Sequence, residues 1–242
     1  METLFKAFLG ILGLFNGNMF RGYEVDIPVV KYGDGLYKEA NNVYVYKGEN
    51  PNNYIYFNDE MWRIISLSKD HIKIIQERSI NIMPFDLTKL TPYSDSSLAE
   101  YLNSYYYDNL DTTAKSVIVP YKFDGLATLN VGILSMPEYL QASSLVKKCG
   151  NLNSYFNNVP LCVNIGNYIN NFDYFGLFHT GWTLTKDNSL YNSIYYFGDV
   201  FYSQIYTFDM AHNVFPVVYL KPNIKLEGKG TVHHPFIINT VD

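Results

Sequence analysis

The amino-acid sequence predicts an α+β fold made of antiparallel sheets with two short helices. Three patterns support this class. Short runs of β-branched and aromatic residues, separated by turn formers, fill residues 43–76. Two short helical patterns occupy residues 96–117, and strand patterns return in residues 181–220. Because strands come first and last, the order argues against βαβ winding and favours an antiparallel sheet with helices on one side.

The first strands are expected to form a meander, because turn residues separate four short apolar runs at 43–47, 54–57, 61–67 and 71–76. Trp62 lies within the third run and is expected in the core. Arg63 alternates to the other face, where it can pair with a carboxylate. Trp182, beside a later strand, is also expected in the core.

Capping residues mark the helices. Ser96 or Ser97 can cap the first helix, and Glu100 stands at capping-box spacing. Asp111 can cap the second, and Pro137 at a first helical position starts a further short helical stretch. The remaining segments are expected to be strands: residues 131–136, 181–185, 190–197, 200–208 and 214–220.

The N-terminal part is expected to differ from the rest of the chain. Residues 4–15 form the only long apolar run, which is too short to span a bilayer. It is best explained as a helix that packs on the domain; a remnant of an export signal, or a helix that docks on a partner or membrane, are the alternatives. Gly and Pro then indicate a connector, so we expect a helix and connector over 1–32 and one α+β domain over 33–242.

Composition excludes several kinds of partner. The chain has 242 residues, of which 48% are hydrophobic, enough for a sizeable core. Its net charge is −5, and no Lys/Arg cluster forms a basic stripe. Neither nucleic acid nor polybasic attraction to a membrane is therefore expected. Tyr is unusually frequent, with 23 residues. A genome biased toward A and T, or a surface that uses Tyr for contacts, can explain this frequency.

Two cysteines, Cys149 and Cys162, flank a segment rich in turn formers. No CxxC pair is present, which excludes a zinc ribbon and a thioredoxin-type motif. A disulfide between the two is favoured over two buried thiols, because such a loop gains about 3 kcal/mol of stability from a staple. A disulfide would place the protein in an oxidising compartment.

No catalytic motif is present. The sequence lacks GxSxG, HExxH, P-loop and GxGxxG spacings. His233 and His234 are adjacent and, in a strand, would point to opposite faces, so no metal site is expected. No cofactor is expected either. Paired carboxylates of a glycan-acting enzyme depend on spatial spacing, which leaves that class as an alternative.

A turn signal at Gly198-Asp199, between two aromatic runs, predicts a two-residue hairpin. In that register, residues that share one face lie opposite each other: Tyr191 with Tyr206, Ser193 with Gln204, and Tyr195 with Tyr202. Such a face can contact a sugar or a protein. Alternatively, the rings simply cover a partly solvated sheet, and a one-residue slip would exchange the faces. These six residues are the candidate ligand-binding face.

Short pieces in a consistent order extend from residue 33 to residue 238: 33–37, 46–54, 62–65, 97–103, 131–135, the Cys149/Cys162 loop, 182–184, 215–220, 230–231 and 234–237. Together they resemble an uncharacterised bacterial extracellular domain family of Gram-positive and wall-less bacteria. The resemblance implies a C-type-lectin-like shape and a surface location, but no activity. The family's usual Arg-Pro is here Phe215-Pro216. Lys221 stands where a calcium–sugar triplet would need a carboxylate, so calcium-dependent sugar binding is not implied.

These observations predict a secreted or surface-exposed, non-catalytic binding or adhesion module for an unknown protein or glycan. The alternative is a structural subunit of a bacterial surface assembly that docks through its N-terminal apolar helix. A glycan-acting enzyme is the third possibility.

Overall fold

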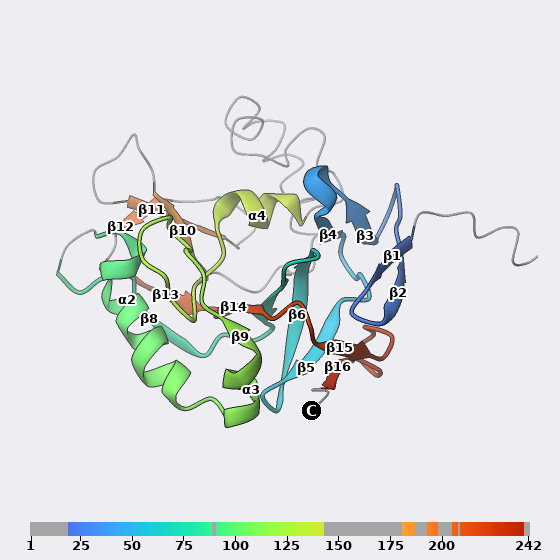
Figure 1. Ribbon diagram of the computed structural model, residues 1–242. Helices are drawn as coiled ribbons and strands as arrows, with labels where there is room; N and C mark the ends of the chain where they lie inside the picture. The colour runs from blue at the N-terminus through green and yellow to red at the C-terminus, as the bar shows by residue number, and fades with distance from the viewer. Residues whose placement is uncertain are drawn as a thin grey trace, which may run out of the picture.

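A computed structural model describes residues 19–88, 91–142, 181–186, 193–197, 205–207 and 209–239 (Figure 1). This part of the chain consists mainly of β-strands with a few short helices, consistent with the expected α+β class. None of its helices is long and apolar enough to cross a membrane. The four expected early strands are confirmed to within one residue.

The main sheet has nine strands, and β6 and β7 lie near its middle. Seven strands follow the order β15 (Lys225–Glu227), β16 (Phe236–Asn239), β5 (Tyr54–Phe57), β6 (Glu60–Leu67), β7 (Ile72–Gln76), β14 (Val217–Leu220) and β9 (Ile118–Val119). The hairpin of β3 (Gly35–Lys38) and β4 (Tyr44–Lys47) completes it. All pairs are antiparallel except β16 with β5.

One edge of β6 is shared by two strands. β7 follows the other edge from Trp62 to Leu67. On the shared edge, β5 pairs with residues 60–63, whereas β4 pairs with Ser66 and Leu67. The chain between β4 and β5 must therefore bridge a gap at this edge.

A second sheet has five strands in the order β12 (Ile205–Thr207), β11 (Ser193–Phe197), β10 (Gly181–Lys186), β13 (Ala211–Val214) and β8 (Asn81–Pro84). The strand expected over residues 214–220 is in fact two strands in two sheets. Phe215 and Pro216 separate β13 from β14, since proline has no N–H with which to continue a ladder. Residues 131–136 are largely buried, but they make only one isolated bridge, between Gly132 and Val217.

The helical segments are η1 (Ala40–Asn42), η2 (Tyr93–Asp95), α2 (Ser97–Glu100), η3 (Tyr101–Tyr106), α3 (Thr112–Val117) and α4 (Met136–Gln141). Two of the helical segments, α2 and α3, have the caps expected at Ser96 and Asp111. The Ser96 hydroxyl accepts a hydrogen bond from the Ala99 N–H at 3.1 Å. The Asp111 carboxylate accepts one from the Ala114 N–H at 2.6 Å. η3, a π-helical segment, continues α2 directly.

Helices contact both faces of the main sheet, contrary to the expected one-sided arrangement. On β7, Lys73 and Gln76 point to opposite faces, because strand side chains alternate. Lys73 contacts Glu138 of α4, whereas the Gln76 amide oxygen accepts a hydrogen bond from Tyr106 of η3 at 2.7 Å. Figure 1 shows α4 well separated from the α2–α3 region.

Both tryptophans lie in the core, as expected. Trp62 is 0% exposed and Trp182 is 2% exposed. The Trp182 indole N–H donates a hydrogen bond to the Met83 carbonyl at 2.8 Å, which joins β10 to β8. The predicted pairing of Arg63 is also confirmed, since a guanidinium nitrogen lies 3.9 Å from a Glu77 carboxylate oxygen.

An N-terminal hairpin occupies residues for which the sequence indicated a connector. It consists of β1 (Met19–Gly22) and β2 (Val25–Pro28). Its turn residues, Tyr23 and Glu24, have φ values of 54° and 57°, a conformation that is uncommon for such residues. Tertiary contacts hold this turn: the Tyr23 hydroxyl donates to the Ser68 carbonyl at 2.7 Å, and Glu24 pairs with Lys225 at 2.9 Å.

A pair of glycine substitutions tests how tightly the C-terminal segment packs on the main sheet. A Cβ at Gly230 (φ 69°) would lie 2.2 Å from the Asn52 carbonyl oxygen, whereas Gly125 (φ 80°) has open space around it. Both Gly→Ala variants incur about 1–2 kcal/mol of left-handed strain. Only Gly230→Ala adds overpacking of about 1–3 kcal/mol. Chemical denaturation should show the larger loss for Gly230→Ala; equal losses would contradict the close approach.

Candidate functional site

The predicted tyrosine-rich hairpin has a different register from the one expected. β11 and β12 pair Ser193 with Thr207 and Tyr195 with Ile205. A two-residue turn at Gly198-Asp199 would instead have paired Tyr195 with Tyr202, so the predicted pairings are wrong. In the observed register, more than two residues separate the paired ends of β11 and β12. The Gly198-Asp199 turn signal did not indicate this.

The predicted face is only partly within the described residues. Tyr191, Tyr202 and Gln204 lie outside the described residues, as do Cys149 and Cys162 and the apolar run 4–15. For Ser193, Tyr195 and Tyr206 the structure describes the strand pairing but not the side chains. Tyr206 is paired with Ile194 rather than with Tyr191. The six residues therefore do not form the paired row that the sequence predicted, and their role in binding remains a prediction.

A groove lies where the N-terminal hairpin meets the shared edge of β6. Its volume is about 370 Å³. Its lining comes from β2 and the β2–β3 connection, the start of β3, β4 with the β4–β5 connection, and the β15–β16 connection with the start of β16. The lining residues are Val25, Asp26, Ile27, Pro28, Val30, Asp34, Gly35, Leu36, Tyr46, Asn50, Pro51, Asn52, Gly228, Lys229 and Phe236.

Asp34 fixes one wall of the groove. Its two carboxylate oxygens accept hydrogen bonds from the backbone N–H groups of Glu49 and Asn50, at 3.1 and 2.9 Å. Gly48 has a φ of 108°, and a Cβ there would lie 2.1 Å from an Asp34 carboxylate oxygen. Only glycine therefore lets the β4–β5 connection approach Asp34 this closely.

The C-terminal connection forms a second wall, directly beside the β4–β5 connection. The Gly230 carbonyl accepts a hydrogen bond from the Tyr54 N–H at 2.8 Å, which ties this connection to the start of β5. The Lys229 N–H donates to the His234 carbonyl at 3.1 Å. At Gly228 (φ 126°) a Cβ would lie 2.3 Å from the Pro235 carbonyl oxygen. Both walls are therefore held by backbone contacts.

The inner surface of the groove is apolar and its rim is polar. Ile27, Leu36, Tyr46 and Phe236 are all buried, with exposures between 1% and 7%. The Tyr46 hydroxyl is enclosed and has no hydrogen-bond partner among the residues that the structure describes. Burial raises its pKa above the usual value for tyrosine, so the phenol stays neutral.

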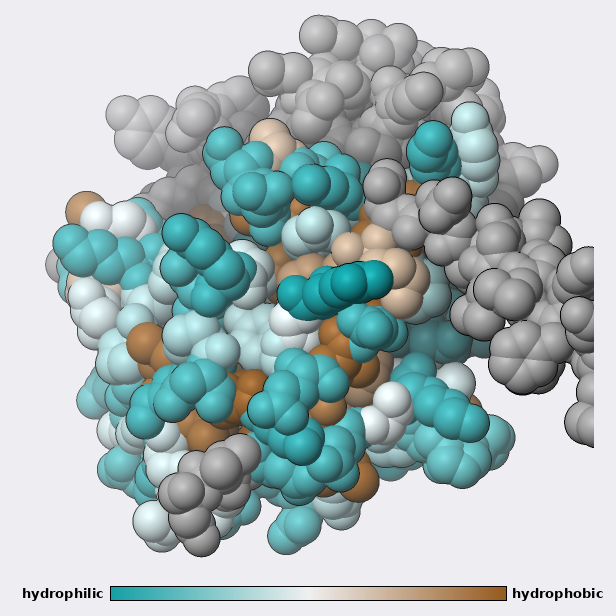
Figure 2. Space-filling model, turned by 45° about the vertical axis from the view of Figure 1, so that its right-hand side comes forward, coloured by the Kyte–Doolittle hydropathy of each residue, from teal (hydrophilic) through white to brown (hydrophobic). Residues whose placement is uncertain are grey.

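The rim carries exposed charged and amide side chains. They are Asp26, Asp34, Asn50, Asn52 and Lys229. Carboxylates therefore outnumber the single ammonium group among the lining residues, and the mouth of the groove has a negative balance. On the face shown in Figure 2, apolar residues reach the surface as separate patches between polar ones.

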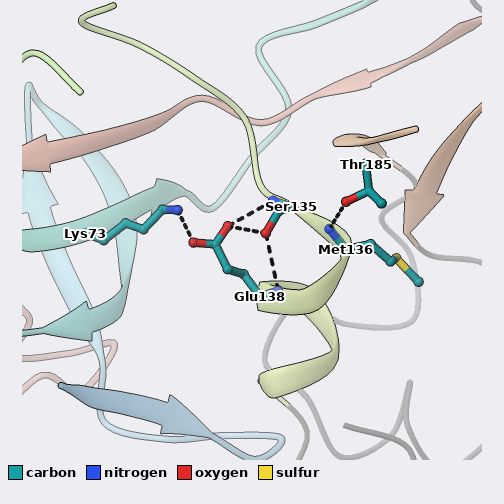
Figure 3. Close-up of polar contacts among 5 residues, drawn as sticks. All are labelled: Lys73, Ser135, Met136, Glu138 and Thr185. Atoms are coloured by element: carbon teal, nitrogen blue, oxygen red, sulfur yellow. Dashed lines mark hydrogen bonds and ion pairs between the residues drawn. The ribbon is translucent and has the colours of Figure 1, made fainter. Parts of the chain in front are cut away.

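A second cluster of polar groups joins the main sheet to α4 (Figure 3). The Lys73 ammonium pairs with one Glu138 carboxylate oxygen; their side chains are 4% and 28% exposed. The other oxygen accepts hydrogen bonds from the Ser135 N–H at 2.9 Å and from its hydroxyl at 2.7 Å. The Glu138 N–H donates back to the Ser135 hydroxyl at 3.4 Å, which completes a capping box at the start of α4.

This cluster has a structural role, because it joins α4 to the main sheet. Burial alone would raise the pKa of Glu138, but the Lys73 ammonium and the Ser135 hydrogen bonds hold it below the usual value. The carboxylate therefore stays ionised at neutral pH and is a poor proton donor or acceptor there. Lys73 also lies 4.9 Å from the centre of the Tyr219 ring, and Thr185 accepts a hydrogen bond from the Met136 N–H at 3.0 Å.

None of the groove residues was predicted from the sequence to form a site. Their signal was present, because residues 33–37, 46–54, 230–231 and 234–237 were among the pieces of the resemblance, and several of these pieces meet at the groove. The sequence did not show that these pieces lie close together, because their proximity depends on pairing between strands that are far apart in sequence. Within the described part of the chain, no group of three His, Cys, Asp or Glu side chains could hold a metal ion.

In comparisons with known proteins, no family model, no curated protein and no solved structure matches this chain. The resemblance and the C-type-lectin-like shape therefore remain predictions from the sequence.

The Lys73–Glu138 pair should be a major contributor to stability. Glu138→Gln leaves the buried Lys73 ammonium without its counter-ion, and we expect a loss of about 3 kcal/mol in the free energy of unfolding. Ser135→Ala keeps the ion pair and removes only the cap, with an expected loss of about 1 kcal/mol. Urea denaturation at pH 7 measures both; equal losses would show that the cap, not the ion pair, dominates.

The same pair predicts a pH dependence. The folded-state pKa of Glu138 is below its usual value of 4.5, so its contribution is complete above that pH and is lost as the pH falls through the folded value. The stability difference between the wild type and Glu138→Gln should therefore shrink as the pH is lowered from 6 to 3. A difference that stays constant over this range would contradict the depressed pKa.

Proposed function

We propose that this protein is a non-catalytic binding module that holds its ligand in the groove beside β2. The observation that carries the proposal is the groove itself: an apolar inner surface, a polar rim, and walls held by backbone contacts. Its volume of about 370 Å³ falls within the range of roughly 300–1,000 Å³ typical of small-molecule sites.

The rigidity of the walls supports binding. Asp34 and the glycines at positions 48 and 228 fix the wall positions before any ligand arrives. A preformed site loses little conformational entropy when it binds, which favours affinity. The loop carrying Asn50 and Asn52 thus presents its polar groups in a defined place.

The chemistry of the ionisable groups also favours binding over catalysis. Glu138 and Lys73 neutralise each other within a helix cap, and Asp34 accepts two backbone hydrogen bonds. Glu138 is held ionised by Lys73 and is a poor proton acceptor at neutral pH, and the Asp34 oxygens are already occupied by backbone N–H groups, whereas acyl transfer or hydrolysis needs an available base beside a nucleophile. A secreted or cell-surface location is part of this proposal and rests on the resemblance and the two cysteines.

A tryptophan at the rim tests the proposal. Asn52 is exposed and lines the groove, so Asn52→Trp should fill its mouth without disturbing the core. Asn109→Trp, an equally exposed site beyond η3, is the matched control. A random-peptide phage library and a glycan array provide the probes. We expect to find a probe that binds the wild type and the Asn109→Trp variant with equal affinity. The same probe should bind the Asn52→Trp variant at least tenfold more weakly.

Two results would overturn the binding function at this groove. One is that neither probe collection contains a binder of the wild type. The other is that every binder is held equally well by Asn52→Trp. Circular dichroism and thermal unfolding of both variants ensure that lost binding reflects the groove rather than unfolding.

A further inference from the structure

The wall formed by β2 differs from the other walls because it is a strand edge. The two-residue turn at Tyr23 and Glu24 makes Gly22 and Val25 a hydrogen-bonded closing pair. Hydrogen-bonded and non-hydrogen-bonded pairs alternate along an antiparallel ladder. Asp26, opposite Arg21, is therefore in a non-hydrogen-bonded pair, and its N–H and C=O point away from β1.

This free edge faces the gap between β2 and β3. Pro28, two residues after Asp26, has the same orientation and leads into the parallel bridge between Val29 and Leu36. The Val30 N–H donates to the Leu36 carbonyl at 2.8 Å, which closes one end of the gap. Among the described residues, none forms a backbone hydrogen bond with Asp26 across this edge.

We propose that the groove binds an extended peptide, which adds to the edge of β2 as a further strand. The inference rests on the proposed function and names the ligand class of that site. Main-chain hydrogen bonds at Asp26 would hold the peptide backbone, as in other cases of strand addition. Alternate side chains would pack on the more accessible apolar residues of the lining, Val25, Pro28 and Val30.

Two observations favour a peptide over a sugar. Sugar sites commonly stack the ring on an exposed aromatic face, whereas Tyr46 and Phe236 are only 1% and 2% exposed. A strand edge offers an N–H and a C=O at strand spacing, which an extended backbone matches. The carboxylates of Asp26 and Asp34 at the rim favour basic side chains in the peptide.

Two substitutions at one position separate the backbone from the side chain. Asp26→Pro removes the N–H, and proline is tolerated at an edge position whose N–H makes no ladder hydrogen bond. Asp26→Ala keeps the N–H and removes only the carboxylate, whose 3.8 Å pair with Arg21 is exposed. For a peptide selected from the phage library, Asp26→Pro should weaken binding at least tenfold and Asp26→Ala less than threefold.

A measurement on the unmodified protein avoids reliance on a variant fold. Hydrogen exchange followed by NMR should show a fast Asp26 amide in the free protein and a protected one in the peptide complex. The Ile27 amide, which pairs with Phe20 within the hairpin, should be protected in both states. N-methylation of the peptide at alternate positions should abolish binding in one register and leave it intact in the other.

The outcomes distinguish the two proposals. Peptide binding that is equal in Asp26→Pro and the wild type, or an Asp26 amide that exchanges equally fast in the complex, overturns strand addition. Glycan binding that Asn52→Trp blocks, without any peptide binding, overturns the peptide and leaves the groove as a binding site. Absence of any binding sensitive to Asn52→Trp overturns both.

Discussion

Burial of both faces of β6 and β7 is the constraint on which much of this structure depends. The five residues of β7 are all buried, and so are most of those of β6. These strands nevertheless carry Arg63, Lys73 and Gln76. A buried charge or amide without a partner costs several kcal/mol, so each of these side chains requires a partner from another segment.

The partners decide where the surrounding elements lie. Lys73 requires Glu138, which brings the first turn of α4 onto one face of the sheet. Gln76 accepts its hydrogen bond from Tyr106, which brings η3 to the other face. Arg63 stacks on the Tyr54 ring, with 3.7 Å between the guanidinium carbon and the ring centre. Polar residues in the middle of the sheet thus specify the packing of segments distant in sequence.

The groove is a consequence of the same sheet. Because β4 and β5 occupy different halves of one β6 edge, the chain between them crosses a gap, and the wall of the groove forms there. The Asp34 carboxylate and the conformation of Gly48 hold that crossing in place. The N-terminal hairpin, anchored through Tyr23 and Glu24, supplies the β2 part of the groove lining. The groove is therefore built from segments that no local pattern connects.

Local patterns in the sequence determined the early strands, the caps at Ser96 and Asp111, and the burial of Trp62, because alternation and capping involve residues within one turn or one strand. Tertiary structure alone decided the register of β11 and β12, which depends on the length of the connection between them. It also decided the hairpin at residues 19–28: a Tyr-Glu turn in the left-handed region has no local signal, and contacts with Ser68 and Lys225 stabilise it. The groove depends on such non-local contacts. For that reason the sequence contained recognisable pieces of the groove lining but did not show that these pieces lie side by side.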